Sequence, residues 1–131
     1  WIEGATEGVP QVEDTGLNTN PRRLESDYGF WSAPTAVVGP AATALWTTVT
    51  TPARTAGLDT TIYTIEIENS TGAAVTAWLE IGGVVITAPF HIVDNDSITI
   101  PYVAGFATGD NDLNCNATAV GVVVSIKGIE M

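Results

Sequence analysis

The stretch that decides the fold is IEIENSTGAAVTAWLEIGG, residues 65–83. Apolar and polar residues alternate on both sides of the NSTG segment at 69–72. Alternation with a period of two is typical of a β-strand with one buried face, and Asn, Ser, Thr and Gly favour a turn. The stretch therefore predicts a β-hairpin. Its inward side chains are Ile65, Ile67, Val75, Ala77, Leu79 and Ile81, and those facing outward before the turn are Ile62, Thr64, Glu66 and Glu68.

The period of two continues toward the C-terminus. Gly82-Gly83 favours a turn, SITIP at 97–101 is a short strand, and VGVVVSIKG at 120–128 is the most regular strand of all. No segment keeps a helical apolar spacing over ten residues. Short strands separated by turn signals are typical of a sandwich. The sequence predicts an all-β fold, a jelly-roll-like antiparallel β-sandwich over residues 58–131.

Residues 1–57 have a different composition, with five of the seven prolines and no sustained periodicity. We interpret them as an extended N-terminal arm with at most one or two short strands. Ordering an irregular backbone costs about 1 to 2 kcal/mol per residue, so the arm must bury large side chains against a surface. We expect that surface to belong to a partner protein. The candidate partner contacts are Trp1, Arg22, Arg23, Tyr28, Phe30, Trp31, Trp46 and, on the polar side of its strand, Trp78.

The charge balance restricts the partners. Fifteen Asp and Glu against four Lys and Arg give a formal net charge of -11. Such a chain gains nothing from counterion release at phosphates, so we expect neither nucleic acid nor an anionic membrane as a partner. No apolar run approaches the length of a membrane span. Because the chain begins with Trp1 and not with Met, we expect a segment upstream of it.

Few reactive groups are available. His91 is the only histidine and Cys115 the only cysteine, which excludes a histidine-rich metal site and an internal disulfide. Cys115 is expected to be a small buried hydrophobic residue. His91 is expected to be an ordinary polar residue at the rim of a loop. We therefore expect no enzyme activity and no cofactor.

The tripeptide DND occurs at 94–96 and again within GDNDLN at 109–114. Asp at the first and third positions with Asn at the fifth is similar to the start of a calcium loop. The similarity ends at Cys115, which stands where the loop needs Gly, and no Glu follows at the twelfth position. We expect solvated loops. If the fold brings both loops to one end, the candidate Ca²⁺ ligands are Asp94, Asp96, Asp110 and Asp112.

The motifs also resemble a known family. In order, these are the strand and Asn/Gly turn of 65–83, SITIPY at 97–102, GDNDLN at 109–114 and a last alternating strand ending near Glu130. Over about residues 60–131 this order resembles the small jelly-roll head decoration (cement) proteins of tailed bacteriophages. The resemblance implies a non-enzymatic protein, often trimeric, that binds the major capsid protein on the outer capsid surface and braces the lattice. The acidic charge agrees with that outer location, away from packaged DNA.

Two other functions stay open. The first is a carbohydrate-binding module, in which Trp78 and Tyr102 form an exposed platform and the DND loops hold calcium. The second is an extracellular fibre subunit whose arm, residues 1–57, donates a strand to the sheet of the next subunit.

Overall fold

The computed structural model describes residues 29–131, and this part of the chain is built from β-strands without a helix. No segment in it is a helix long and apolar enough to cross a membrane. The strands are β2 (Gly29–Trp31), β3 (Thr35–Val37), β4 (Thr43–Trp46), β5 (Thr60–Asn69), β6 (Val75–Ile81), β7 (Val84–Val85), β8 (Phe90–Ile92), β9 (Asp96–Gly109), β10 (Leu113–Ala117) and β11 (Val122–Glu130).

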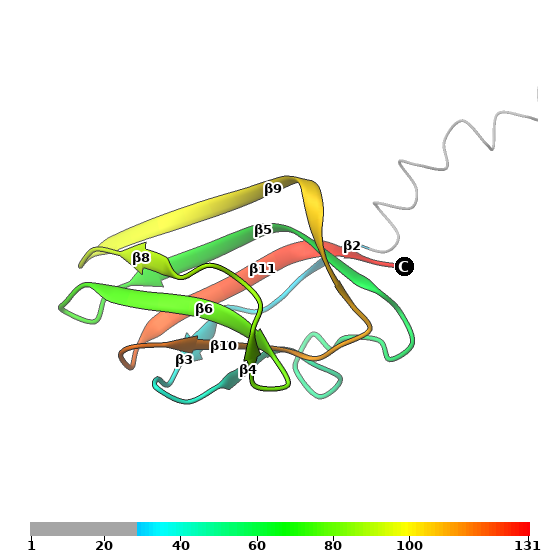
Figure 1. The fold of residues 1–131 in the computed structure, drawn as a ribbon, viewed down its shortest axis with the longest axis horizontal. Coiled ribbons are helices and arrows are strands. Elements are labelled where there is room, and N and C mark those ends of the chain that lie inside the picture. The colour runs from blue at the N-terminus through cyan, green and yellow to red at the C-terminus, as the bar shows by residue number, and fades with distance from the viewer. Residues whose placement is uncertain (1–28) are drawn as a thin grey trace, which may run out of the picture.

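Two antiparallel sheets pack face to face (Figure 1). One has the order β4–β10–β6, with β7 and β8 sharing the far edge of β6. The other has the order β11–β5–β9, with β2 and β3 sharing the far edge of β11. The two short strands that share an edge, β2 with β3 and β7 with β8, can each be counted as one interrupted strand. Numbered from 1 to 8 along the chain on that basis, the strands have the order 2-7-4-5 in the first sheet and 1-8-3-6 in the second. This is the strand order of a jelly roll. The predicted jelly-roll-like antiparallel sandwich is confirmed.

The core lies between the inner faces of the two sheets and follows the alternation seen in the sequence. A register shift between β5 and β9 near Tyr63 turns Ile62 inward as well, although the period alone assigned Ile62 to the outer face. Cys115 is fully buried among these apolar side chains, as expected. The core consists of Val37, Leu45, Trp46, Ile62, Ile65, Ile67, Val75, Ala77, Leu79, Ile92, Leu113, Cys115, Ala117, Val122, Val124 and Ile126.

The two strands predicted within residues 65–83 exist, but their pairing as a hairpin is wrong. Strand β5 pairs with β11 and β9, whereas β6 pairs with β10, β7 and β8 in the other sheet. The NSTG segment therefore carries the chain across the core from one sheet to the other. The alternation of apolar and polar residues indicates which side chains of a strand are buried. It does not indicate which other strand pairs with it in the sheet.

The predicted boundary at residue 57 does not match the fold. Trp31 pairs with Lys127, Thr35 with Val124 and Thr43 with Cys115, so the chain from residue 29 onward supplies three strands to its own sandwich. These strands have only three or four residues each, too few for a period of two to be recognised. The rest of the predicted arm, residues 1–28, lies outside the described residues.

Candidate functional site

Trp46 belongs to the core and is not available for a partner. It is 1% exposed, and its ring stacks on that of Phe30 with centroids 4.2 Å apart and an interplanar angle of 12°. A register shift between β4 and β10 buries Leu45 together with Trp46. Phe30 also packs against the core. The prediction of Trp46 and Phe30 as partner contacts is therefore corrected, while Trp1, Arg22, Arg23 and Tyr28 lie outside the described residues.

Trp31 and Trp78 lie on the outer faces of different sheets. Trp31 is 41% exposed on β2. Trp78 is half-buried on β6, where its indole N–H donates a 2.7 Å hydrogen bond to the Glu80 carboxylate. Asn116 donates to the same carboxylate at 3.1 Å. Both tryptophans stay predicted partner contacts.

The platform expected from Trp78 and Tyr102 does not form. Tyr102 lies on β9 in the opposite sheet, and its ring packs 5.3 Å from that of Phe106, partly buried against the core. Burial also raises the pKa of the Tyr102 hydroxyl. The two aromatic side chains therefore cannot contact one ligand together.

The two DND loops lie at opposite ends of the sandwich. Asp96 pairs with Asn69 at one end of β5, and Gly109, next to Asp110, pairs with Thr60 at the other. Nine residue steps separate Thr60 from Asn69 along β5, which corresponds to about 30 Å. The prediction that Asp94, Asp96, Asp110 and Asp112 share a calcium ion is wrong. Residues 29–131 contain no group of three or more His, Cys, Asp or Glu that could hold a metal.

Asp110 and Asp112 instead hold Arg54, whose side chain is 6% exposed. The guanidinium contacts Asp110 at 2.5 Å and Asp112 at 3.0 Å. Asp110 also accepts a hydrogen bond from the Gly57 N–H at 3.1 Å. Bonds from Arg54 and Gly57 to the ionised carboxylate hold the pKa of Asp110 below its ordinary value of 3.8. These contacts close the loop between β4 and β5 onto the sandwich.

Replacing Arg54 by Met is expected to destabilise the protein at neutral pH and to change its response to acid. Because the pKa of Asp110 is depressed by folding, its stabilising contribution is complete above the ordinary value and is lost as the pH falls through the folded pKa. The difference in urea midpoint between the natural protein and Arg54→Met should therefore shrink as the pH falls below about 4. A difference that stays constant over this range would contradict the role given to Asp110.

His91 and Cys115 lie on different faces of one sheet and cannot form a nucleophile pair. The Cys115 thiol points into the core, and burial raises its pKa to about 12. The His91 ring is exposed on the outer face, with Nδ1 3.0 Å from the Thr76 hydroxyl. A thiol needs to be deprotonated and accessible to act as a nucleophile, so Cys115 is a core residue.

Four loops meet at the end of the sandwich marked by Asn69, which lies at the left in Figure 1. We call the loops at 38–42, 70–74, 93–95 and 118–121 the loop end. The buried Asn69 side chain organises two of these loops, 70–74 and 93–95. Its amide donates to the carbonyls of Ala73, Ile92 and Val93 at 2.8 to 3.1 Å, and its oxygen accepts bonds from the N–H and hydroxyl of Thr71.

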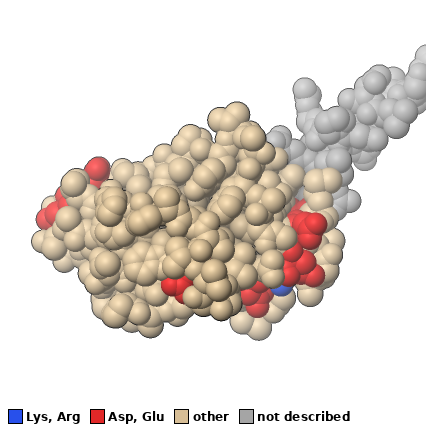
Figure 2. Space-filling view, viewed as in Figure 1, with Lys and Arg blue, Asp and Glu red and all other residues tan. Residues whose placement is uncertain are grey.

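Three valines project from separate loops of the loop end. The exposed fractions are 55% for Val38, 62% for Val93 and 61% for Val120. Asp94 and Asp96 are exposed beside them. Figure 2 shows acidic side chains gathered toward the two ends of the visible face, with most of the surface between them free of charged side chains. Exposed apolar residues rimmed by polar ones are typical of a contact surface for another protein.

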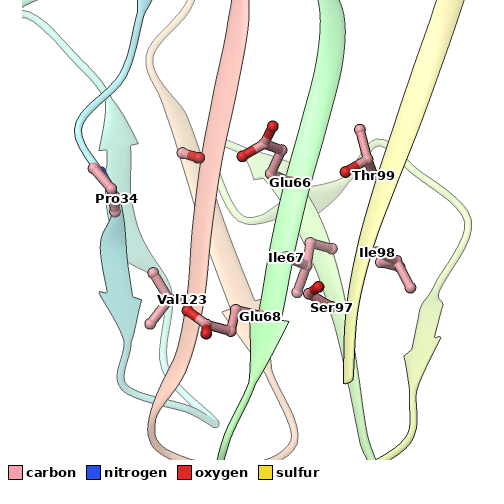
Figure 3. A pocket seen from close by; sticks show the side chains of 9 residues that line it. Pro34, Glu66, Ile67, Glu68, Ser97, Ile98, Thr99 and Val123 are labelled. Atoms are coloured by element: carbon pink, nitrogen blue, oxygen red, sulfur yellow. The ribbon is translucent and has the colours of Figure 1, made fainter. Parts of the chain in front are cut away.

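A groove crosses the outer face of the β11–β5–β9 sheet. It is formed by two adjoining hollows, of about 310 Å³ and 430 Å³, that share Glu66. The Glu66 and Glu68 side chains extend from β5 toward β11, and Thr99 faces them from β9 (Figure 3). We call this surface the outer-face groove. Its lining residues are Trp31, Pro34, Thr64, Glu66, Ile67, Glu68, Ser97, Ile98, Thr99, Val123, Ser125 and Lys127.

Strand register sets the rows of the outer-face groove. Trp31, Lys127 and Thr64 are aligned across the sheet in one row. Ser125, Glu66 and Thr99 form the next row, and Val123, Glu68 and Ser97 form the third. Sequence alternation placed Glu66 and Glu68 on an outer face. It could not show that Trp31 lies on the same face, because that depends on which strands are neighbours.

Comparison with family models and with curated sequences adds no relative. No protein-family model matches the chain, and no curated protein sequence matches it significantly. The resemblance to phage head decoration proteins therefore stays a prediction from the sequence.

Proposed function

We propose that this protein is a non-enzymatic structural protein that decorates the outer surface of a phage capsid, as a homotrimer bound to the major capsid protein. The motif order over about residues 60–131 and the jelly-roll strand order both agree with the resemblance described above. The net charge of -11 supports a location outside the capsid shell, because packaged DNA repels an acidic protein.

The observation that carries the proposal is the exposure of Val38, Val93 and Val120 on three separate loops at one end. The Asn69 amide bonds the carbonyl of Val93, and the Gly121 N–H bonds the carbonyl of Val37, so the backbone that carries the three valines is held in place before a partner binds. A prearranged apolar surface loses less conformational entropy on binding than a mobile one. The loop end is the surface that we assign to the capsid lattice.

The two alternatives differ in what supports them. For a fibre subunit, the edge of β11 is already filled by β2 and β3 of the same chain, so a donated strand would have to pair at another sheet edge. For a carbohydrate-binding module, the expected platform and calcium site do not form, but the outer-face groove offers a different surface. Its ligand is considered below.

Co-sedimentation with capsids assembled from the major capsid protein of the same virus tests the proposal. The natural protein should sediment with the capsids, and Val120→Asp should not, because burying an unpaired carboxylate in the contact is costly. Val49→Asp is the matched control, since Val49 is 85% exposed in the loop between β4 and β5, at the opposite end. Light scattering should give the mass of a trimer.

Two results would contradict the proposal. The first is failure of the natural protein to bind capsids. The second is equal binding by Val120→Asp and the natural protein, which would remove the loop end from the contact. Because Val120 and Val49 are both exposed, neither substitution is expected to prevent folding.

A further inference from the structure

The outer-face groove combines an aromatic ring with a high density of hydrogen-bonding groups. Trp31 and Lys127 lie at one end, followed along the sheet by Glu66 and Ser125 and then by Glu68. The four residue steps from Lys127 to Val123 on β11 span about 13 Å. This length accommodates more than one ring of a linear oligosaccharide.

The lining is poor in the groups that form the centre of protein interfaces. Such centres are enriched in aromatic side chains, Met and Arg and depleted in Lys, Glu and Ser. The outer-face groove has one aromatic residue at its end, while Glu66, Glu68, Ser125 and Lys127 provide much of its wall. A ligand with many hydroxyl groups satisfies such a wall better than a protein surface does.

Each group in the groove suits one part of a sugar. Carboxylates accept hydrogen bonds from hydroxyls, the ammonium of Lys127 donates to hydroxyl or ring oxygens, and Thr99 does both. The exposed face of Trp31 can pack against the apolar C–H face of a sugar ring.

The acidic charge of the groove determines which classes of sugar it can bind. Glu66 and Glu68 face the groove, Lys127 is the one basic residue that lines it, and the whole chain carries -11. Uronic acids, sialic acids and phosphorylated glycans are repelled by such a surface. We propose that the outer-face groove binds a neutral polysaccharide, with Trp31 stacking on a sugar ring and Glu66 and Glu68 accepting bonds from its hydroxyls. This function goes beyond capsid decoration and uses a surface distinct from the loop end.

Titration of the full chain with neutral hexasaccharides (maltohexaose, cellohexaose and mannohexaose), followed by calorimetry and NMR, tests this inference. At least one of them should bind, with shifts at Glu66 and Thr99, whereas a hexamer of galacturonic acid should not. Trp31→Ala and Glu66→Gln should each weaken binding by about tenfold. Trp78→Phe, on the other sheet, should bind as the natural protein does.

Three outcomes would overturn the inference. These are the absence of binding to all three neutral hexasaccharides at millimolar concentration, binding that Trp31→Ala leaves unchanged, and stronger binding of the galacturonic acid hexamer. Val120→Asp should keep its sugar binding even though we expect it to lose the capsid. Failure of the glycan site and failure of the capsid contact are therefore distinguishable.

Discussion

Replacing Trp46 by Ala is expected to lower the free energy of unfolding by about 4 kcal/mol, the range found for buried tryptophans. Trp46 is almost completely buried and stacks on Phe30, so its removal leaves a large cavity between β4 and β2. Domains of this size have a total stability of about 5 to 15 kcal/mol, and the loss is a large part of it. Urea denaturation followed by far-ultraviolet circular dichroism measures the change.

Trp31→Ala is the matched control, because it removes the same kind of side chain from β2, where the tryptophan lies on the outer face of its sheet. Its expected loss is about 1 kcal/mol or less, as for most surface substitutions. Trp46→Phe should be milder than Trp46→Ala, since it keeps an aromatic ring against Phe30 and removes an indole N–H that has no acceptor within residues 29–131. Equal losses for Trp46→Ala and Trp31→Ala would contradict the assignment of Trp46 to the core.

Asn69→Ala is expected to destabilise the protein by about 3 kcal/mol and to loosen the loop end. The substitution removes the donor shared by the carbonyls of Ala73, Ile92 and Val93, and it leaves buried polar groups without partners. Each such group costs about 1 to 3 kcal/mol. Urea denaturation measures the loss. Amide hydrogen exchange should show reduced protection at 70–74 and 93–95 before other regions respond.

Asn111→Ala is the control at the opposite end of the sandwich. Asn111 is exposed and donates one hydrogen bond, to the Thr108 carbonyl at 2.8 Å, so its loss should cost about 0.5 to 1 kcal/mol. If Asn69→Ala were no more destabilising than Asn111→Ala, the organising role of Asn69 would be wrong. If Asn69→Ala folds but no longer sediments with capsids, the fixed position of the Val93 loop matters for binding.

The fold class could be predicted from the sequence because burial on one face leaves a period of two in the residues. Ile65 and Ile67, or Val122 and Val124, report their inward direction directly. The identity of the strand that pairs with a given strand leaves no comparable pattern in the residues of that strand. The error at 69–72 has this origin, since a turn within a hairpin and a crossover between sheets use the same residue types.

The site residues were harder to predict for a related reason. An exposed tryptophan and a buried one look alike in a short strand, and only the tertiary position of β4 decides that Trp46 is inside. The acidic tripeptide at 110–112 suggested a metal, yet its carboxylates bind Arg54, which is 56 residues away from Asp110 along the chain. The outer-face groove depends on the register of β11, β5 and β9, which the residues of one strand do not encode.

The pairing of β11 with β2, β3 and β5 has a consequence for biosynthesis. Within residues 29–131, β11 is the last strand, and it lies in the middle of its sheet, between β5 on one side and β2 and β3 on the other. A nascent polypeptide on the ribosome therefore cannot complete this sheet until residues 122–130 have emerged. Until then the earlier strands expose apolar edges and faces, which makes the unfinished chain prone to aggregate or to require chaperones.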